Sequence, residues 1–167
     1  MPSMKSVIEA DNKKKLNVTT KKENEKKCSC PRNTICPLEG QCLSKNIIYQ
    51  ATVKSNDKEE TYVGLTATDF KSRLANHKTS FKYNTKRNAT ELSKYIWSLK
   101  ENNLDYSISW KILCHASPYS NKTKRCNLCI AEKYFIICKP GAATLNKRTE
   151  IIGKCRHKDR FLLMNTK

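Results

Sequence analysis

Residues 47–53, IIYQATV, and residues 61–65, TYVGL, decide the fold of this chain. Both runs are apolar and rich in β-branched and aromatic residues, a composition typical of strands. The polar run SNDKEE, residues 55–60, separates them and is predicted to connect them as a hairpin. An antiparallel strand pair is therefore the expected centre of the domain.

Helices and one more strand are expected downstream. Helical spacing of apolar residues predicts helices over FKSRLANHKTSF (70–81) and ELSKYIWSLKEN (91–102), capped by Thr68 and Thr90. Alternation predicts a third strand over YSISWKIL (106–113), and a further helix is expected over 125–138, before the break at Pro140 and Gly141. Residues 144–163 are expected to form a short extended piece and a helical turn. This order predicts an α/β (α+β) fold, with a small three-stranded antiparallel sheet flanked by helices.

The chain divides into three parts by composition. Residues 1–27 are polar and lysine-rich, so they are expected to form a disordered basic arm. Such an arm could hold DNA loosely, act as a nuclear address or be a solvated leader without function. Residues 28–45 are rich in cysteine and turn-forming residues, and residues 46–165 carry the globular domain.

The charge balance points to a polyanionic partner. Lysine and arginine total 33 against 15 aspartate and glutamate residues, a formal net charge of +18. Nucleic acid fits this balance best, because neutralising phosphates releases counterions. No apolar run approaches the roughly 20 residues needed to cross a bilayer, and no lipidation signal or amphipathic membrane helix is visible. DNA is the expected partner, and no membrane association is expected.

Nine cysteines favour metal binding over disulfides. An odd number cannot be fully paired within the chain, and the amino-terminal residues lack the apolar stretch of a secretory signal. A disulfide-rich secreted protein is therefore disfavoured, and an intracellular location with reduced thiols is expected.

Two groups of residues have spacings that suit structural zinc. The first group combines a C-x-x-C pair with a later C-x-H pair: Cys126, Cys129, Cys155 and His157. The second group is the set of cysteines in the amino-terminal segment: Cys28, Cys30, Cys36 and Cys42. A mixed site, in which Cys36 and Cys42 join the carboxyl-terminal ligands, is an alternative. Cys114 and Cys138 are interpreted as core cysteines.

An ordered set of motifs runs along these elements. The set begins with Ile47–Ile48–Tyr49 and Tyr62–Val63–Gly64 on the two strands, and continues with Arg73 and His77 as R-x-x-x-H and with Glu132 and Asn146 further along the chain. This ordered set resembles the GIY-YIG endonuclease family, in which a glutamate and then an asparagine follow the earlier motifs. The runs CPLEGQC, TELSKYIW, PYSNKTKRCNLC and NKRTEIIGKCRHKDRFLL are similar to the endonuclease domain of Penelope-like retroelements. Ile47 departs from the pattern, because it replaces the glycine of the first motif.

The resemblance implies a division of roles among these residues. Glu132 is expected to bind catalytic Mg²⁺ or Mn²⁺, since a hard cation takes oxygen ligands and keeps several waters. Arg73 is expected to clamp the phosphate, because its planar guanidinium stays charged. Tyr49 would help to deprotonate the attacking water, and Tyr62 would position the water or the phosphate. His77 could share proton transfer or bind phosphate. Asn146 would orient Glu132 or the phosphate by hydrogen bonding.

The sequence therefore predicts a metal-dependent DNA endonuclease that nicks DNA, with Mg²⁺ (or Mn²⁺) as the catalytic ion and Zn²⁺ as a structural ion. A nuclear location is expected, and a reverse transcriptase of the same element is a candidate partner. The alternative is a zinc-stabilised DNA-binding module without catalysis. Only the endonuclease requires the tyrosines, Arg73, Glu132 and Asn146 to converge.

Overall fold

The structure is a computed structural model that describes residues 26–56, 58–147 and 155. Most of the expected basic arm lies outside the described residues. So do His157 and most of residues 144–163, for which an extended piece and a helical turn were predicted. No helix within the described ranges is long and apolar enough to cross a membrane.

The predicted three-stranded antiparallel sheet is confirmed, with the order β2-β1-β3. Its strands are β1 (Ile47–Ser55), β2 (Lys58–Thr66) and β3 (Ser107–His115). The connection between β1 and β2 is shorter than predicted, because the strands pair as far as Ser55 and Lys58. Asn56 has a positive φ of 49° in this tight turn, a conformation that asparagine tolerates.

Two helices follow β2 along the chain. Helix α2 covers Phe70–Lys82 and helix α3 covers Glu91–Glu101, with the short η1 (Asn84–Lys86) between them. The prediction of Thr68 as the first cap is wrong, because the Asp69 carboxylate accepts the amide hydrogen bond of Ser72 at 2.8 Å. The prediction of Thr90 as the second cap is confirmed, since its hydroxyl accepts the amide of Ser93 at 3.0 Å.

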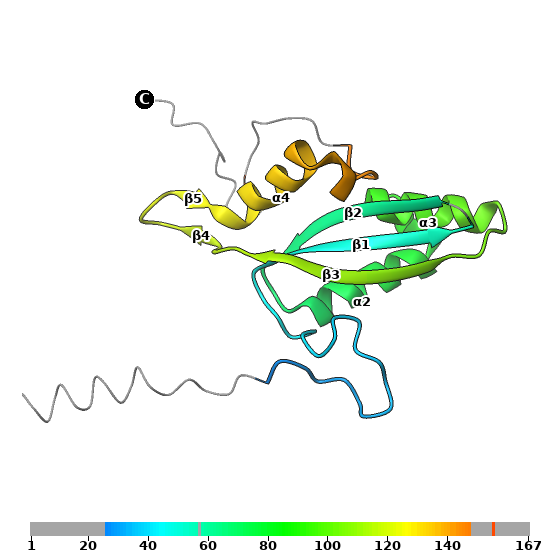
Figure 1. Ribbon diagram of the computed structural model, residues 1–167, viewed down its shortest axis with the longest axis horizontal. Coiled ribbons are helices and arrows are strands. Elements are labelled where there is room, and N and C mark those ends of the chain that lie inside the picture. Colours follow the sequence, from blue (N-terminus) through cyan, green and yellow to red (C-terminus); the bar gives the residue numbers. More distant parts are fainter. Residues whose placement is uncertain (1–25, 57, 148–154, 156–167) are drawn as a thin grey trace, which may run out of the picture.

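Helix α4 (Asn127–Cys138) lies on the other face of the sheet (Figure 1). It begins two residues later than predicted, because β5 (Arg125–Cys126) pairs with β4 (Tyr119–Ser120). The 3₁₀ turn η2 (Pro140–Ala142) follows α4 at the predicted break. Cys138 ends α4 and is exposed, so its prediction as a core residue is wrong.

Successive side chains of β1 point to opposite faces of the sheet, so this strand contributes to both halves of the core. Tyr49, Ala51 and Val53 pack with the buried residues of α2 and α3. Ile48 faces the other way and packs with Val63, Leu65 and the buried residues of α4. The sheet is thus a layer between two helical layers, and side chains two residues apart on one strand reach the same layer.

Ile47, the residue that replaces the motif glycine, is a fully buried member of the α2–α3 core. It lies opposite Thr66 on β2 and His115 on β3, next to a register shift of the β1–β3 pairing between Ile48 and Tyr49. An isoleucine is well suited to such a position, because β-branched residues pack well in strands.

Candidate active site

Tyr49 lies at the centre of a buried hydrogen-bond network with Arg73 and His77. Its hydroxyl oxygen is 2.8 Å from His77 Nε2 and accepts a hydrogen bond from Arg73 Nε at 3.0 Å. Because a guanidinium can only donate, the Tyr49 O–H is available to donate to the imidazole. The spacing of Arg73 and His77 on α2, one turn apart, brings both to the same tyrosine.

The surroundings of this network favour neutral forms of Tyr49 and His77. Burial, followed by the nearby charge of Arg73, lowers the pKa of His77 to about 3. Burial raises the pKa of Tyr49 above its usual range, with a further contribution from Tyr62, although Arg73 opposes the shift. Tyr49 is therefore a phenol at neutral pH. The resemblance implies that Tyr49 helps to deprotonate the attacking water. A neutral Tyr49 could do so only if it passed its own proton to His77.

The contact between Gly64 and Tyr49 explains the glycine at the end of the second motif, Tyr62–Val63–Gly64. Gly64 lies directly opposite Tyr49 in the β1–β2 pairing, and the Tyr49 ring crosses it. A Cβ atom placed on Gly64 would be 2.5 Å from the Tyr49 hydroxyl oxygen and 2.6 Å from Cζ. Only glycine leaves room for the tyrosine to reach Arg73 and His77 in this position.

We expect Gly64→Ala to displace Tyr49 and to lower the free energy of unfolding by about 1–3 kcal/mol, the usual cost of overpacking a core. Urea denaturation measures this change. Gly141→Ala is the matched control, because a Cβ there meets no atom within 4 Å. Equal stabilities of the two variants would show that the Tyr49 ring does not depend on Gly64.

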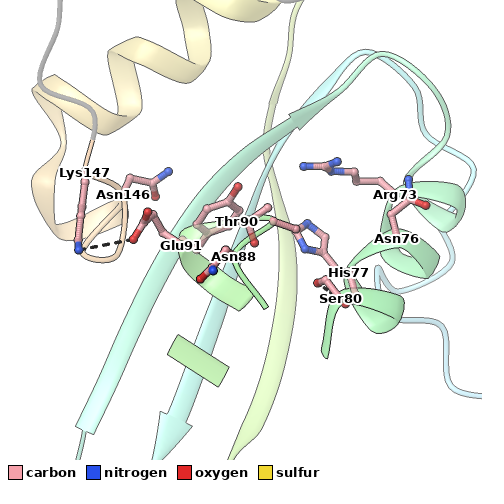
Figure 2. A pocket seen from close by; sticks show the side chains of 11 residues that line it. Arg73, Asn76, His77, Ser80, Asn88, Thr90, Glu91, Asn146 and Lys147 are labelled. Carbon is pink, nitrogen blue, oxygen red and sulfur yellow. Dashed lines mark hydrogen bonds and ion pairs between the residues drawn. The ribbon is translucent and has the colours of Figure 1, made fainter. Parts of the chain in front are cut away.

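A pocket of about 420 Å³ opens beside this network (Figure 2). Helix α2 supplies Arg73 and His77, β2 supplies Tyr62, and the carboxyl-terminal segment supplies Asn146. The Tyr62 and His77 rings meet edge to face, with centroids 6.0 Å apart. Four of the predicted residues thus line one pocket, whereas Tyr49 lies beneath it with no exposed surface.

The rim of the pocket carries polar residues that sequence reasoning missed. They come from α2, from the loop before α3, from the start of α3 and from the carboxyl-terminal segment: Asn76, Ser80, Asn88, Thr90, Glu91 and Lys147. Glu91 and Lys147 form an ion pair of 3.7 Å across the rim, drawn as a dashed line in Figure 2. The capping sequence Thr90–Glu91 was the available signal for two of these residues. The loop that places Asn88 carried no sequence signal of this kind.

Glu132 is buried on α4, with 2 % of its surface exposed. It does not line the 420 Å³ pocket, since α4 covers the other face of the sheet. Its charge nevertheless reaches the network. Burial lowers the pKa of Arg73, but Tyr49, Tyr62 and Glu132 together raise it above its usual value. The predicted metal ligand and the predicted phosphate clamp are therefore close enough to interact electrostatically.

Asn146 attaches the carboxyl-terminal segment to the edge strand of the sheet. Its side-chain oxygen accepts the Val63 amide at 2.8 Å, and its side-chain nitrogen donates to the Val63 carbonyl at 2.9 Å. The neighbouring Leu145 amide also bonds to the Thr61 carbonyl, at 2.9 Å. These contacts hold Asn146 next to Tyr62, an arrangement that the sequence did not predict.

The four amino-terminal cysteines form a cluster that could hold a metal such as zinc. The sulfur atoms of Cys28, Cys30, Cys36 and Cys42 all lie within 4.8 Å of one another. Cys42 Sγ is 3.5 Å from Cys28 Sγ and 3.6 Å from Cys30 Sγ, close to the roughly 3.8 Å edge of a tetrahedral zinc–thiolate site. The mixed site considered from the sequence is wrong, because Cys36 and Cys42 belong to this cluster.

The protonation of this cluster also suits a cation. The hydrogen bond with Cys42, followed by burial, raises the pKa of Cys30 to about 12. Burial would raise the pKa of Cys36 too, but hydrogen bonds from the Leu38 and Gly40 amides help lower it to about 6. Burial also raises the pKa of Cys42. A bound divalent ion would favour the thiolate forms of its ligands.

The carboxyl-terminal cluster contains Cys126, Cys129 and Cys155, whose sulfur atoms lie within 4.8 Å of one another. All three are buried, and Cys129 Sγ is 3.7 Å from Cys155 Sγ. This cluster could also hold a metal such as zinc. His157, the predicted fourth ligand, lies outside the described residues.

Comparisons of the chain with protein-family models, with curated proteins and with solved structures gave no match.

Proposed function

We propose that this chain is a metal-dependent DNA endonuclease of the GIY-YIG type, which nicks DNA and derives from or serves a Penelope-like retroelement. The observation that carries the proposal is the hydrogen-bonded network of Tyr49, His77 and Arg73 beside the 420 Å³ pocket. A charge of +18 supports DNA as the ligand. A nuclear location and a reverse transcriptase partner belong to the same proposal.

Arg73 is the proposed phosphate clamp. Its Nε is bonded to Tyr49, which fixes the plane of the guanidinium, and the residue lines the pocket. The two terminal nitrogens are then oriented to donate to two phosphate oxygens, the geometry for which arginine is suited. Tyr62 and Asn146 line the same pocket and would position the phosphate or the attacking water.

Glu132 is the proposed ligand of Mg²⁺ or Mn²⁺, because it is the carboxylate whose charge acts on both Tyr49 and Arg73. A single carboxylate fits an ion that keeps several of its waters. When bound there, the cation supplies positive charge to the phosphate and makes a coordinated water more acidic. A His77 with a pKa of about 3 is a weak base by itself, so Tyr49 and His77 would accept a proton only from such an acidified water.

A non-catalytic, zinc-stabilised DNA-binding module is the second candidate. It is favoured by the raised pKa of Tyr49, which keeps the phenol protonated, and by the absence of Glu132 from the residues that line the pocket. Both candidates use the two cysteine clusters to hold the amino-terminal segment and α4 in position.

Arg73→Ala separates the two candidates. We expect nicking of supercoiled plasmid in Mg²⁺ to slow by about a hundredfold, the usual effect of removing one donor from a developing charge. DNA affinity should change little, because Arg73 is one of 33 basic residues. Arg125→Ala, which removes an exposed arginine of β5, is the matched control and should leave both rates and affinities near wild type. Equal nicking rates of Arg73→Ala and Arg125→Ala would exclude Arg73 as a residue of the active site.

A further inference from the structure

Helix α2 presents different side chains to two hollows. Arg73, Asn76, His77 and Ser80 line the 420 Å³ pocket. Lys71, Leu74, Ala75 and Lys78 line a second hollow of about 640 Å³. Positions two residues apart on a helix differ by about 200° in direction, so α2 is the wall between the two hollows. We call the second hollow the lateral groove.

The lateral groove has apolar walls and a basic rim. Its apolar residues come from the amino-terminal cysteine segment, from α2 and from β3: Pro31, Ile35, Pro37, Leu74, Ile108 and Trp110. Ile35 is 94 % exposed, and it is one of four large hydrophobic side chains that are exposed among the described residues. Lys71 and Lys78 stand on the helix side, with one opposing acid, Glu39.

The amino-terminal cysteine segment is fastened to α2, so the groove has two fixed walls. Lys71 Nζ donates to the hydroxyl of Ser29 at 2.8 Å and to its carbonyl at 3.2 Å. The Lys71 amide also donates to the Cys42 carbonyl at 2.8 Å. Cys30, Cys36 and Cys42 line the groove, and the cysteine cluster therefore forms part of its wall.

Trp110 connects the lateral groove to the candidate active site. It lines the groove from β3, and its ring centroid is 5.4 Å from that of His77 and 5.9 Å from that of Tyr49. A ligand that lies against Trp110 is thus separated by one aromatic layer from the network that would act on the phosphate.

We propose that the lateral groove binds an unpaired base of the DNA strand whose phosphate occupies the pocket at Arg73. The inference rests on the proposed function, because it takes DNA as the ligand. Apolar and aromatic walls match the face of a base, which an intact duplex keeps stacked, and lysines beside them match the adjoining phosphates. An aliphatic side chain such as Ile35 can also hold a base step apart. The preferred substrate is therefore DNA with unpaired nucleotides next to the cut.

Trp110 provides a direct reporter of this binding. The chain has two tryptophans, and Trp97→Phe leaves Trp110 as the single one. Without added Mg²⁺, an unlabelled single strand of about 15 nucleotides should quench Trp110 emission strongly, whereas a blunt duplex of the same sequence should not. Circular dichroism shows whether the Trp97→Phe protein is folded. Quenching that is equal with the single strand and the duplex would overturn the proposal.

A second measurement uses the otherwise unaltered chain. Ile35→Ser should weaken binding of the single strand by about tenfold, as measured by fluorescence anisotropy, and should leave duplex binding unchanged. Tyr134→Ser, which removes a half-exposed aromatic from α4, is the control and should bind both forms as wild type does. Unchanged single-strand affinity in Ile35→Ser would also overturn the proposal, as would equal losses for single strand and duplex.

These results separate the lateral groove from the endonuclease proposal. If the single strand binds in the groove but wild type never cuts DNA, the groove stands and the endonuclease fails. If wild type cuts DNA, and Ile35→Ser binds the single strand and cuts DNA as well as wild type does, the proposal for the groove is wrong and the proposed endonuclease is supported.

Discussion

Glu132→Gln is expected to slow DNA nicking in Mg²⁺ by about a thousandfold while leaving DNA affinity equal or slightly higher. Glutamine keeps the size and polarity of the side chain but removes the charge that would hold the cation, and metal coordination contributes several kcal/mol to stabilising a phosphate transition state. Affinity should persist because it comes from the excess of lysine and arginine, and one negative charge disappears. Nicking rates and anisotropy titrations at a fixed salt concentration measure the two quantities.

Glu101→Gln is the matched control, since Glu101 lies at the end of α3 and pairs with Arg87 at 2.7 Å. It should nick DNA as fast as wild type does. Glu132 is buried, so thermal unfolding of the Gln variant must accompany the assay. A folded Glu132→Gln protein that nicks at the wild-type rate would exclude Glu132 as the metal ligand.

Loss of metal from the carboxyl-terminal cluster is expected to have the largest effect on stability. We expect two zinc ions per chain by elemental analysis, one for each cysteine cluster. Cys129→Ser should lose one ion and lower the melting temperature by more than about 10 °C, because zinc binding contributes directly to folding free energy. Cys129 is one helical turn before Glu132, so nicking should also fall.

Cys138→Ser is the control for this experiment, because Cys138 ends the same helix and is exposed. It should retain two zinc ions and the wild-type melting temperature. A chain that binds no zinc, or a Cys129→Ser variant with unchanged stability, would contradict a structural role for the metal.

The sheet was predictable because its strands carry strong local signals. Apolar β-branched runs located β1 and β2, and strict alternation located β3. The pairing of β3 with β1 was not predicted, since a third strand could also have paired with β2. Boundaries were less predictable. The cap of α2 is Asp69 and not Thr68, since both neighbours have capping side chains and only backbone geometry decides between them.

The residue types of the candidate site could be predicted from the sequence. The depth of each side chain and the face of the sheet on which it lies could not. The motifs brought Arg73, His77 and Tyr62 to one pocket, as an R-x-x-x-H spacing on a helix allows. The sequence could not show that Tyr49 is buried beneath Gly64, because that contact depends on strand register. Nor could it show that α4 covers the face of the sheet opposite to α2 and α3, since the choice of face depends on tertiary packing.

Nicking of supercoiled plasmid by the wild-type chain tests the proposed endonuclease most directly. Mg²⁺ or Mn²⁺ should convert the supercoiled form to the open circle, and EDTA should stop the conversion while DNA binding continues. If the protein binds DNA but leaves the plasmid supercoiled with either metal, or if cutting continues unchanged in EDTA, the metal-dependent endonuclease is contradicted.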